Sequence, residues 1–260
     1  MAHTAILERT PSTRTPILKS VCPAGPIGHV ATLCSTCALR ATCLPCGMQQ
    51  QDLGSVDEVI YSRRRVHRGE HIYRAGEPFE SLYAFRSGFF KSYVDAPDGQ
   101  TQVIGFPMAG EVVGMDGIDD DCHRLNVVTL DDGEVCVIPY AHFEAVAMRV
   151  PALQRQLHKM MSREIVREQQ LMTLLGGMRA ESRVGAFLLA LSEKFAARGY
   201  SATQFRLRMT REEIGSYLGL KLETVSRVLS RFQEKGLITA QLRSITIVDV
   251  AGLNTIVPDY

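Results

Sequence analysis

A short segment near the N-terminus concentrates four cysteines, Cys34, Cys37, Cys43 and Cys46. The spacers between them are two, five and two residues long. Thiolates are soft ligands, so cysteines at this density indicate either a metal centre or disulfides. Two-residue spacers let neighbouring sulfurs turn toward one centre, as in zinc and iron–sulfur sites. The segment therefore predicts a metal site.

The spacing also bears on which metal is bound. Zinc sites built from paired cysteines usually separate the two pairs by a dozen or more residues. Iron–sulfur clusters accept irregular spacing and often take one ligand from a distant part of the chain. An iron–sulfur cluster is therefore favoured, with a structural zinc knuckle as the open alternative.

A second chemical signature lies near the C-terminus, where Glu223, Ser226 and Arg227 follow i, i+3, i+4 spacing. On a helix these side chains project from one face. Arginine can bind guanine through two hydrogen bonds, glutamate can accept one from cytosine, and serine can serve either base. The three residues predict a helix that reads base edges in DNA.

The surrounding sequence supplies the elements that position this helix. Thr210 and Glu213 form a capping box at the start of one short helix. Gly219 ends that helix, and a second one runs from about residue 222 to 235. Two short runs, 237–240 and 244–250, follow as a hairpin. Helix, turn, helix and hairpin predict a winged helix-turn-helix domain.

Local charge supports contact with nucleic acid, although the whole chain is nearly neutral. The 29 basic and 28 acidic residues give a net charge of +1. Between residues 205 and 244, however, there are eight basic residues and only four acidic ones. The basic set is Arg206, Arg208, Arg211, Lys221, Arg227, Arg231, Lys235 and Arg243. Such an excess favours phosphate contacts.

The composition is that of an ordinary soluble protein, with 45% hydrophobic and 22% charged residues. The first 20 or so residues lack the apolar core of a signal peptide. No stretch is apolar for the roughly 18 residues that a membrane span needs. We therefore expect a cytoplasmic protein without membrane contact, in which cysteines stay reduced and serve metals or chemistry.

Between residues 56 and 139 the sequence consists of short apolar runs separated by glycines, which predicts an antiparallel barrel or jelly roll. From Pro151 the pattern changes to that of a long helix. Its apolar stripe consists of Leu153, Leu157, Met161, Ile165, Met172 and Leu175, with Glu168 on the same stripe. Steps of three and four residues are typical of a coiled-coil seam, although packing on its own barrel is an alternative.

The order of these segments resembles the Crp/Fnr regulators, and more narrowly the fumarate and nitrate reduction regulator branch. The similar stretches include SLYAFRSGFFKSY, IGFPMAGEVVGMDGI, VCVIP and ETVSRVLSRFQ. The resemblance implies an α+β chain with five parts. They are a disordered leader (1–30), a cysteine-rich segment (31–50), a β-roll sensor domain (51–150), a dimerisation helix (151–178) and a winged helix-turn-helix domain (179–260).

The resemblance also implies an oxygen-labile 4Fe-4S cluster. Cys34, Cys37 and Cys43 match the three N-terminal ligands of that branch, and Cys136 matches the ligand from the barrel. Cys46 is an additional thiol that competes for the fourth position. Cys22 and Cys122 match no ligand position.

Further roles follow from the same resemblance. Glu223, Ser226 and Arg227 match the E-x-x-S-R motif that reads palindromic TTGAT-type sites. The apolar seam with Ile165 and Glu168 implies a homodimer whose formation depends on the cluster. The acidic stretch from Asp116 through Asp119, Asp120 and Asp121 resembles a surface that contacts RNA polymerase, and a solvated turn is the alternative. Lys221 departs from the family, because it replaces the usual Ser or Thr N-cap.

Two other functions are less consistent with the residues. Cyclic-nucleotide receptors of this superfamily bind the phosphate through an Arg-Ser pair, and no such pair follows the Gly110–Gly114 segment. A phosphate would lose charge-assisted hydrogen bonds without that arginine, so we expect no cyclic nucleotide. A metal-dependent enzyme would need clustered histidines, and only His67 and His71 are close in sequence. We therefore expect a regulator and not an enzyme. A Crp-like regulator with a zinc or another small-molecule effector is the alternative.

Overall fold

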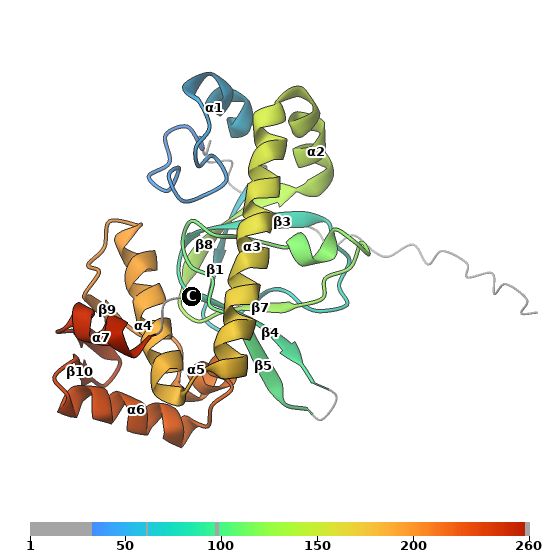
Figure 1. Ribbon diagram of the computed structural model, residues 1–260. Helices are drawn as coiled ribbons and strands as arrows, with labels where there is room; N and C mark the ends of the chain where they lie inside the picture. The colour runs from blue at the N-terminus through green and yellow to red at the C-terminus, as the bar shows by residue number, and fades with distance from the viewer. Residues whose placement is uncertain (1–32, 61, 97–98, 258–260) are drawn as a thin grey trace, which may run out of the picture.

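The computed structural model describes residues 33–60, 62–96 and 99–257. The expected leader and Cys22 lie outside these ranges. Figure 1 shows a β-roll at the centre, a long helix along its front and a second unit at the lower left. This is the α+β arrangement of β-roll, long helix and winged helix that the sequence predicts.

Two four-stranded antiparallel sheets make up the β-roll. One sheet has the order β1 (Ser62–Val66), β8 (Gly133–Pro139), β3 (Ser81–Ser87) and β6 (Val112–Val113). The other has the order β2 (His71–Tyr73), β7 (Asn126–Thr129), β4 (Phe90–Asp95) and β5 (Thr101–Gly105). Phe85 and Phe90 are fully buried and stack with their ring centroids 3.6 Å apart. Aromatic burial of this kind contributes strongly to a core.

The turn between β3 and β4 explains one of the glycines that punctuate the sequence. Gly88 has φ of +95°, a conformation that L side chains rarely adopt. A Cβ atom at Gly88 would also lie only 3.0 Å from the Cα atom of Gly133. Both the backbone conformation and the close approach of the two chain segments at Gly88 and Gly133 therefore require glycine at position 88.

Helices cover the end and one side of the β-roll. Helices α1 (Gln50–Asp57) and α2 (Tyr140–Arg149) were not anticipated from the sequence, nor was the short η1 helix (Met115–Gly117). Helix α3 (Pro151–Gly177) agrees with the expected long helix and has its proline in the first turn, where no N–H is needed. Its first two turns pack Leu153 and Leu157 against Phe143 and Val146 of α2.

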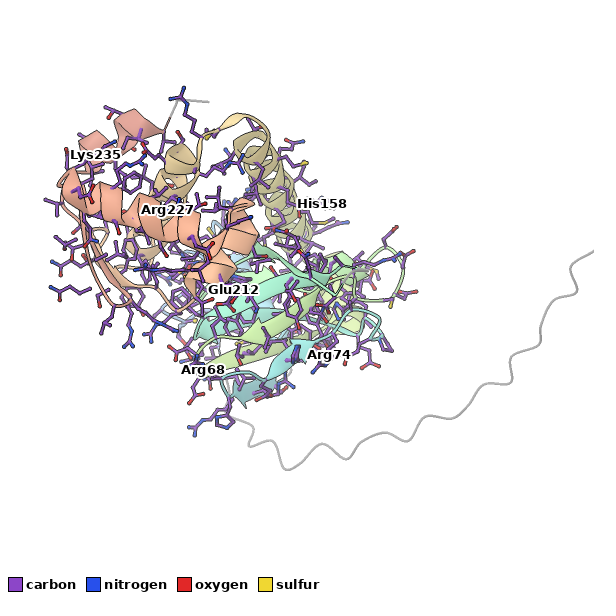
Figure 2. All side chains as sticks on the ribbon, turned by 90° about the horizontal axis from the view of Figure 1, so that it is seen from below. Arg68, Arg74, His158, Glu212, Arg227 and Lys235 are labelled. Atoms are coloured by element: carbon purple, nitrogen blue, oxygen red, sulfur yellow. The ribbon has the colours of Figure 1, made fainter. Side chains whose placement is uncertain are left out.

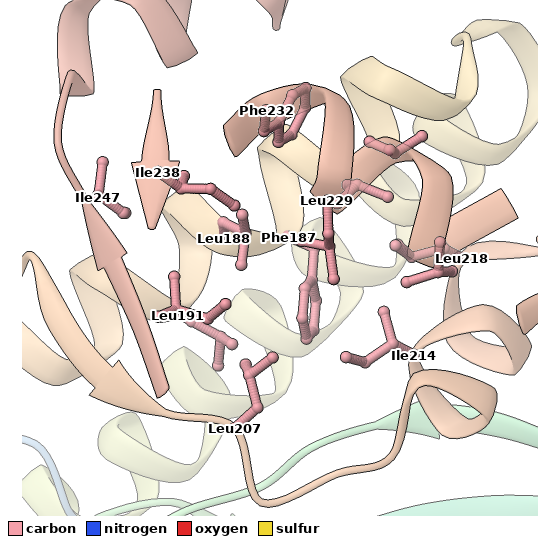
Figure 3. Close-up of a cluster of buried hydrophobic side chains, with 14 of the residues drawn as sticks. Phe187, Leu188, Leu191, Leu207, Ile214, Leu218, Leu229, Phe232, Ile238 and Ile247 are labelled. Atoms are coloured by element: carbon pink, nitrogen blue, oxygen red, sulfur yellow. The ribbon is translucent and has the colours of Figure 1, made fainter. Parts of the chain in front are cut away.

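The C-terminal unit contains α4 (Ala180–Ala196), β9 (Gln204–Arg206), α5 (Arg211–Leu218), α6 (Leu222–Glu234), β10 (Ile238–Gln241), β11 (Ser244–Ile247) and α7 (Val250–Ile256). The strands form an antiparallel sheet in the order β10, β11, β9. Figure 3 shows the core between this sheet and the helices, in which Phe187 of α4 and Phe232 of α6 are buried. Val103 and Phe106 of the β-roll belong to the same buried cluster, so the two units share apolar packing. Within the described ranges, no helix combines the length and the apolar character of a membrane span.

Candidate metal centre and DNA-binding surface

The cysteine loop, which we define as residues 34–46, is a series of tight turns in front of α1. Cys43 donates its backbone N–H to the Leu39 carbonyl at 2.9 Å, and Cys46 donates to the Cys43 carbonyl at 2.9 Å. Asp57 at the end of α1 accepts two hydrogen bonds from Ser35, at 2.8 Å from the backbone N–H and 2.6 Å from the hydroxyl. The loop is therefore tied to a helix and held close to the β-roll.

Four cysteines from two distant parts of the chain border one small cavity of about 20 Å³. They are Cys34, Cys37 and Cys43 of the loop and Cys136 of strand β8. The pairing of β8 between β1 and β3 brings Cys136 to this place, opposite Arg63 and Ala84. The rest of the wall includes the apolar side chains of Leu39, Leu44, Phe85 and Ile138 and the two arginines Arg40 and Arg86.

The other cysteines lie elsewhere. Among the described residues that border this cavity, Cys46 does not appear, although it is close enough to influence Cys43 electrostatically. Cys122 lies on the far loop before β7, where its backbone bridges to Pro78. No described cysteine is in a disulfide. The geometry thus groups the four cysteines that the sequence resemblance selects as ligands.

Burial makes three of these thiols, those of Cys34, Cys43 and Cys136, weaker acids by raising the pKa of each. It raises the pKa of Cys43 to about 12, with the neighbouring Cys136, Cys37 and Cys46 adding to the rise. Burial likewise raises the pKa of Cys34 and of Cys136, although Arg63 and Arg86 oppose the rise at Cys136. A metal ligand must be a thiolate, so loading a metal here releases protons, and the positive metal must offset the desolvation.

The thiols surround the cavity without converging on one point. Among the described residues, no three His, Cys, Asp or Glu side chains are close enough together to hold a metal ion. The four-thiol donor set fits an iron–sulfur cluster, since each iron of a 4Fe-4S cluster takes one thiolate.

The expected recognition helix is α6, and its position follows from local sequence. Thr210 accepts from the Glu213 N–H at 3.1 Å while the Glu213 carboxylate accepts from the Thr210 N–H at 2.7 Å, which is the predicted capping box of α5. Gly219 then adopts φ of +61° and lets the chain turn into α6. The apolar face of α6 buries Val225, Val228, Leu229 and Phe232 in the domain core.

The opposite face of α6 carries the three residues expected to read bases. Glu223 and Arg227 are exposed and Ser226 is half-buried. Figure 2 labels Arg227 on this helix, at the surface of the DNA-binding domain. Lys221 makes no side-chain cap at the helix start, as its side chain cannot accept a hydrogen bond from the backbone.

Part of the basic excess in this domain is used inside the protein. Arg231 and Lys235 both pair with Glu181 on α4. Arg208 pairs with Asp131 of the β-roll at 2.8 Å. The exposed cations left for phosphates therefore include Arg206, Arg211, Lys221 and Arg227.

The structure divides the predicted apolar seam of α3 into two halves. Leu153 and Leu157 are buried against the β-roll. Farther along the helix, Met161, Ile165 and Met172 are exposed, and so is Glu168 between them. The first half of the stripe thus packs on the β-roll, whereas Met161, Ile165 and Met172 of the second half are exposed and Leu175 is half-buried.

The acidic stretch is also divided. The Asp116 carboxylate accepts hydrogen bonds from the Tyr73 hydroxyl and from the Arg124 and Leu125 N–H groups, at 2.9 to 3.0 Å. Burial alone would raise the pKa of Asp116, but these bonds and the nearby His123 hold it below the ordinary value. Asp116 is therefore engaged in hydrogen bonds within its own loop. Asp119, Asp120 and Asp121 are exposed, and Asp120 pairs with Arg124.

A larger cavity of about 410 Å³ lies between α3 and the β-roll. Residues of the segment 110–116 and of α3 line it, including Glu164 and Arg167. Arg167 pairs with Glu164 and lies 3.6 Å from Glu111. The Arg167 guanidinium is therefore already paired with carboxylates of the protein, whereas Arg163, which also borders the cavity, is exposed.

Contacts that sequence reasoning missed hold the C-terminal unit against the β-roll. Ser216 of α5 donates its hydroxyl to the Thr101 carbonyl at 2.8 Å and accepts from the Val103 N–H at 2.9 Å. Lys91 of β4 pairs with Glu213 at 2.9 Å. In the sequence these residues look like ordinary polar surface residues. No spacing rule predicts a contact between segments this far apart in the chain.

Two family models match separate parts of the chain. Residues 63–150 match a cyclic nucleotide-binding domain, and residues 182–256 match a Crp-like helix-turn-helix domain. These ranges correspond to the β-roll and the winged helix.

Similar proteins extend the match to most of the chain. The transcriptional regulatory protein btr of Bordetella pertussis is 44% identical over 89% of this chain and 96% of its own length. This chain belongs to the Crp/Fnr family. Another Crp/Fnr relative, the transcriptional activator protein anr of Pseudomonas aeruginosa, is 43% identical over 83% of this chain and 88% of its own length. The fumarate and nitrate reduction regulatory protein of Vibrio cholerae is 38% identical over 87% and 90%.

A solved Crp/Fnr structure agrees with the fold. FixK2 of Bradyrhizobium japonicum matches with a TM-score of 0.71 and 30% identity, covering 76% of this chain and 98% of that one. The comparisons confirm the resemblance found in the sequence. They also confirm that this Crp/Fnr chain is a DNA-binding regulator of transcription and not an enzyme.

Proposed function

We propose that this protein is an oxygen-responsive activator of transcription that binds a two-fold symmetric DNA site as a homodimer. The observation that supports it most is the grouping of Cys34, Cys37 and Cys43 with Cys136 around one cavity. The relatives add weight, since one is named for fumarate and nitrate reduction and others are called anaerobic regulatory protein.

The residues around the cavity suit a 4Fe-4S cluster. Four thiols provide one ligand for each iron. The apolar side chains of Leu44, Phe85 and Ile138 limit the access of water. Arg63 and Arg86 act electrostatically on Cys136 and would offset part of the negative charge of four thiolates. When bound, the cluster would supply an oxygen-labile link between the cysteine loop and strand β8.

The exposed half of α3 suits association with a second copy of the chain. Met161, Ile165 and Met172 are apolar side chains that remain largely exposed on the second half of α3. Burial of apolar surface is the dominant favourable term in most protein–protein association. Glu168 lies on the same stripe and opposes association, because two desolvated carboxylates repel. Dimer formation would therefore be finely balanced, which suits a switch.

The winged helix would bind the operator. In a dimer, each α6 helix presents Glu223, Ser226 and Arg227 to one half-site, and the sequence expectation for that half-site is TTGAT. The exposed residues Asp119, Asp120 and Asp121 are the proposed contact with RNA polymerase. We place the protein in the cytoplasm and propose no cyclic nucleotide as effector.

The test is chemical analysis of full-length protein purified without oxygen. Iron and acid-labile sulfide near four atoms each per chain, with a visible absorption that bleaches in air, would support the proposal. DNA binding and sedimentation measured before and after bleaching should show loss of the dimer and of operator binding. A colourless preparation with one zinc per chain, unchanged in air, would establish the zinc alternative instead.

A further inference from the structure

Glu111 lies where the β-roll, the long helix and the DNA-binding domain meet. It belongs to the loop between β5 and β6. Its carboxylate accepts from Lys194 at 2.8 Å and from Arg198 at 2.9 Å, at the end of α4 and just beyond it. Arg167 of α3 lies 3.6 Å away. One carboxylate thus contacts cations from two other parts of the chain.

The same cations also bind the backbone of the loop that carries Glu111. Lys194 donates to the Phe106 carbonyl at 3.4 Å, and Arg198 donates to the Ala109 carbonyl. The Arg198 side chain is only 5% exposed and that of Glu111 is 20% exposed. Removing one partner of a buried ion pair leaves an uncompensated charge, which is far more disruptive than losing a surface pair.

The balance of charges at this junction makes Glu111 hard to replace. Two carboxylates, Glu111 and Glu164, face the three cations Arg167, Lys194 and Arg198. Glu164 pairs with Arg167. Without Glu111, both cations of the DNA-binding domain would lose their carboxylate partner and face Arg167 across the junction.

The residue before Glu111 packs against the cysteine loop. Gly110 has φ of +89°, and a Cβ atom there would overlap the hydroxyl of Thr42. Thr42 directly precedes Cys43, which borders the small cavity. The Thr42 side chain therefore lies directly against the backbone beside Glu111, so a change in the position of the cysteine loop would alter this contact.

We propose that Glu111 is a positioning residue that holds the DNA-binding domain in a fixed orientation on the β-roll, and that the cysteine loop acts on this orientation through Thr42 and Gly110. The second half rests on the proposed function. A dimer must present its two α6 helices about one helical turn of DNA apart, roughly 34 Å. A domain that is free to reorient would lose conformational entropy when it binds DNA, which weakens binding. It would also tolerate other spacings between the two half-sites.

The test compares Glu111→Gln with Glu193→Gln in full-length protein purified without oxygen. Glu193 is exposed on the same helix α4, so the control removes the same charge without touching the junction. Glu111→Gln should bind a palindromic site about tenfold or more weakly. It should also lose its preference between that site and sites lengthened by one or two base pairs. Glu193→Gln should behave as wild type.

Hydrogen exchange provides a readout that needs no DNA. In Glu111→Gln, backbone amides of residues 106–111 and of α5 should exchange faster, while sedimentation stays that of wild type. Lys194→Gln should have the same effect. It leaves two carboxylates facing two cations and therefore no uncompensated charge, so it can replace Glu111→Gln if that variant folds poorly. Unchanged exchange together with unchanged spacing preference in both variants would overturn the positioning role.

The coupling to the cysteine loop is tested on the same samples. Air should increase exchange at residues 106–111 in wild type and produce no further increase in Glu111→Gln. A wild-type protein that bleaches in air without any change in exchange there would overturn the coupling. The absorption spectrum separates this result from failure of the proposed function. A colourless wild type would contradict the presence of the cluster. The exchange comparison between wild type and Glu111→Gln would still test the positioning role.

Discussion

Lys91 on strand β4 donates to the carboxylate of Glu213 on helix α5 at 2.9 Å, across the boundary between the β-roll and the DNA-binding domain. The same carboxylate closes the capping box of α5 by accepting from the Thr210 N–H. One side chain therefore both starts the first helix of the helix-turn-helix and fixes that helix to the β-roll.

Replacing Glu213 should destabilise this boundary in a pH-dependent way. Burial alone would raise the pKa of Glu213, but the hydrogen bonds from Lys91 and Thr210 outweigh it and hold the pKa below the ordinary 4.5. Stability from this carboxylate is thus fully present above about pH 4.5 and is lost as the pH falls through the lowered pKa. Glu213→Gln should cost about 1 to 2 kcal/mol near pH 7.

Urea unfolding of wild type and Glu213→Gln at several pH values measures this effect. The difference should shrink as the pH falls below the ordinary pKa. Glu212→Gln is the control, because Glu212 lies in the same helical turn, is exposed and makes no contact across the boundary in the described structure. An equal effect of both variants would show that only the helix dipole is involved.

The cysteines should separate into ligands and bystanders. Serine at Cys34, Cys37, Cys43 or Cys136 should abolish assembly of the cluster, since each removes the thiolate of one iron. Cys46→Ser and Cys122→Ser are the matched controls and should keep full iron and sulfide content. Iron analysis with the visible spectrum, on protein reconstituted without oxygen, checks this. Retention of the cluster in Cys136→Ser and its loss in Cys46→Ser would identify Cys46 as the fourth ligand.

Arg227 should read a guanine in each half-site. Alanine at Arg227 should cost about 1 to 3 kcal/mol per half-site and relax the preference at that base pair. Lys221→Ala is the comparison, because a phosphate contact weakens binding equally on all sequences and lowers the salt dependence by about one unit per contact. Titrations against operators substituted at single positions distinguish the two kinds of contact. Uniform weakening by Arg227→Ala would make it a phosphate contact.

Glu168 should keep the cluster-free protein monomeric. Glu168→Ala removes the charged side chain from between the exposed Ile165 and Met172, so the variant should dimerise and bind DNA in air. Gln170→Ala changes an exposed residue of the same helix off the apolar stripe and should have no effect. Sedimentation of air-exposed protein decides the question. A wild type that is already dimeric in air, or a Glu168→Ala variant that stays monomeric, would remove the proposed role.

The acidic residues should differ according to their contacts. Asp116→Asn should lower stability by about 1 to 3 kcal/mol, because it weakens several hydrogen bonds to one partly buried carboxylate. Asp119→Asn combined with Asp121→Asn should leave stability and DNA binding unchanged and reduce transcription by RNA polymerase in vitro. Parallel loss of DNA binding and transcription in the double variant would contradict a polymerase contact.

Features determined by neighbouring residues were predictable from the sequence. The capping box at Thr210, the turn at Gly219 and the single apolar face of α6 depend on contacts within a few residues, so periodicity and capping rules suffice for them. The start of α3 at Pro151 follows for the same reason.

Tertiary structure alone decided what happens between distant segments. Cys136 reaches the cysteine loop because β8 pairs with β1 and β3, and strand register depends on the whole sheet. Asp116 and Asp119 belong to the same acidic stretch of the sequence, yet the Tyr73 hydroxyl donates to Asp116, whereas Asp119 is exposed. The junction at Glu111 likewise depends on how two cores pack, because charged side chains carry no sequence signal for a partner brought near by folding.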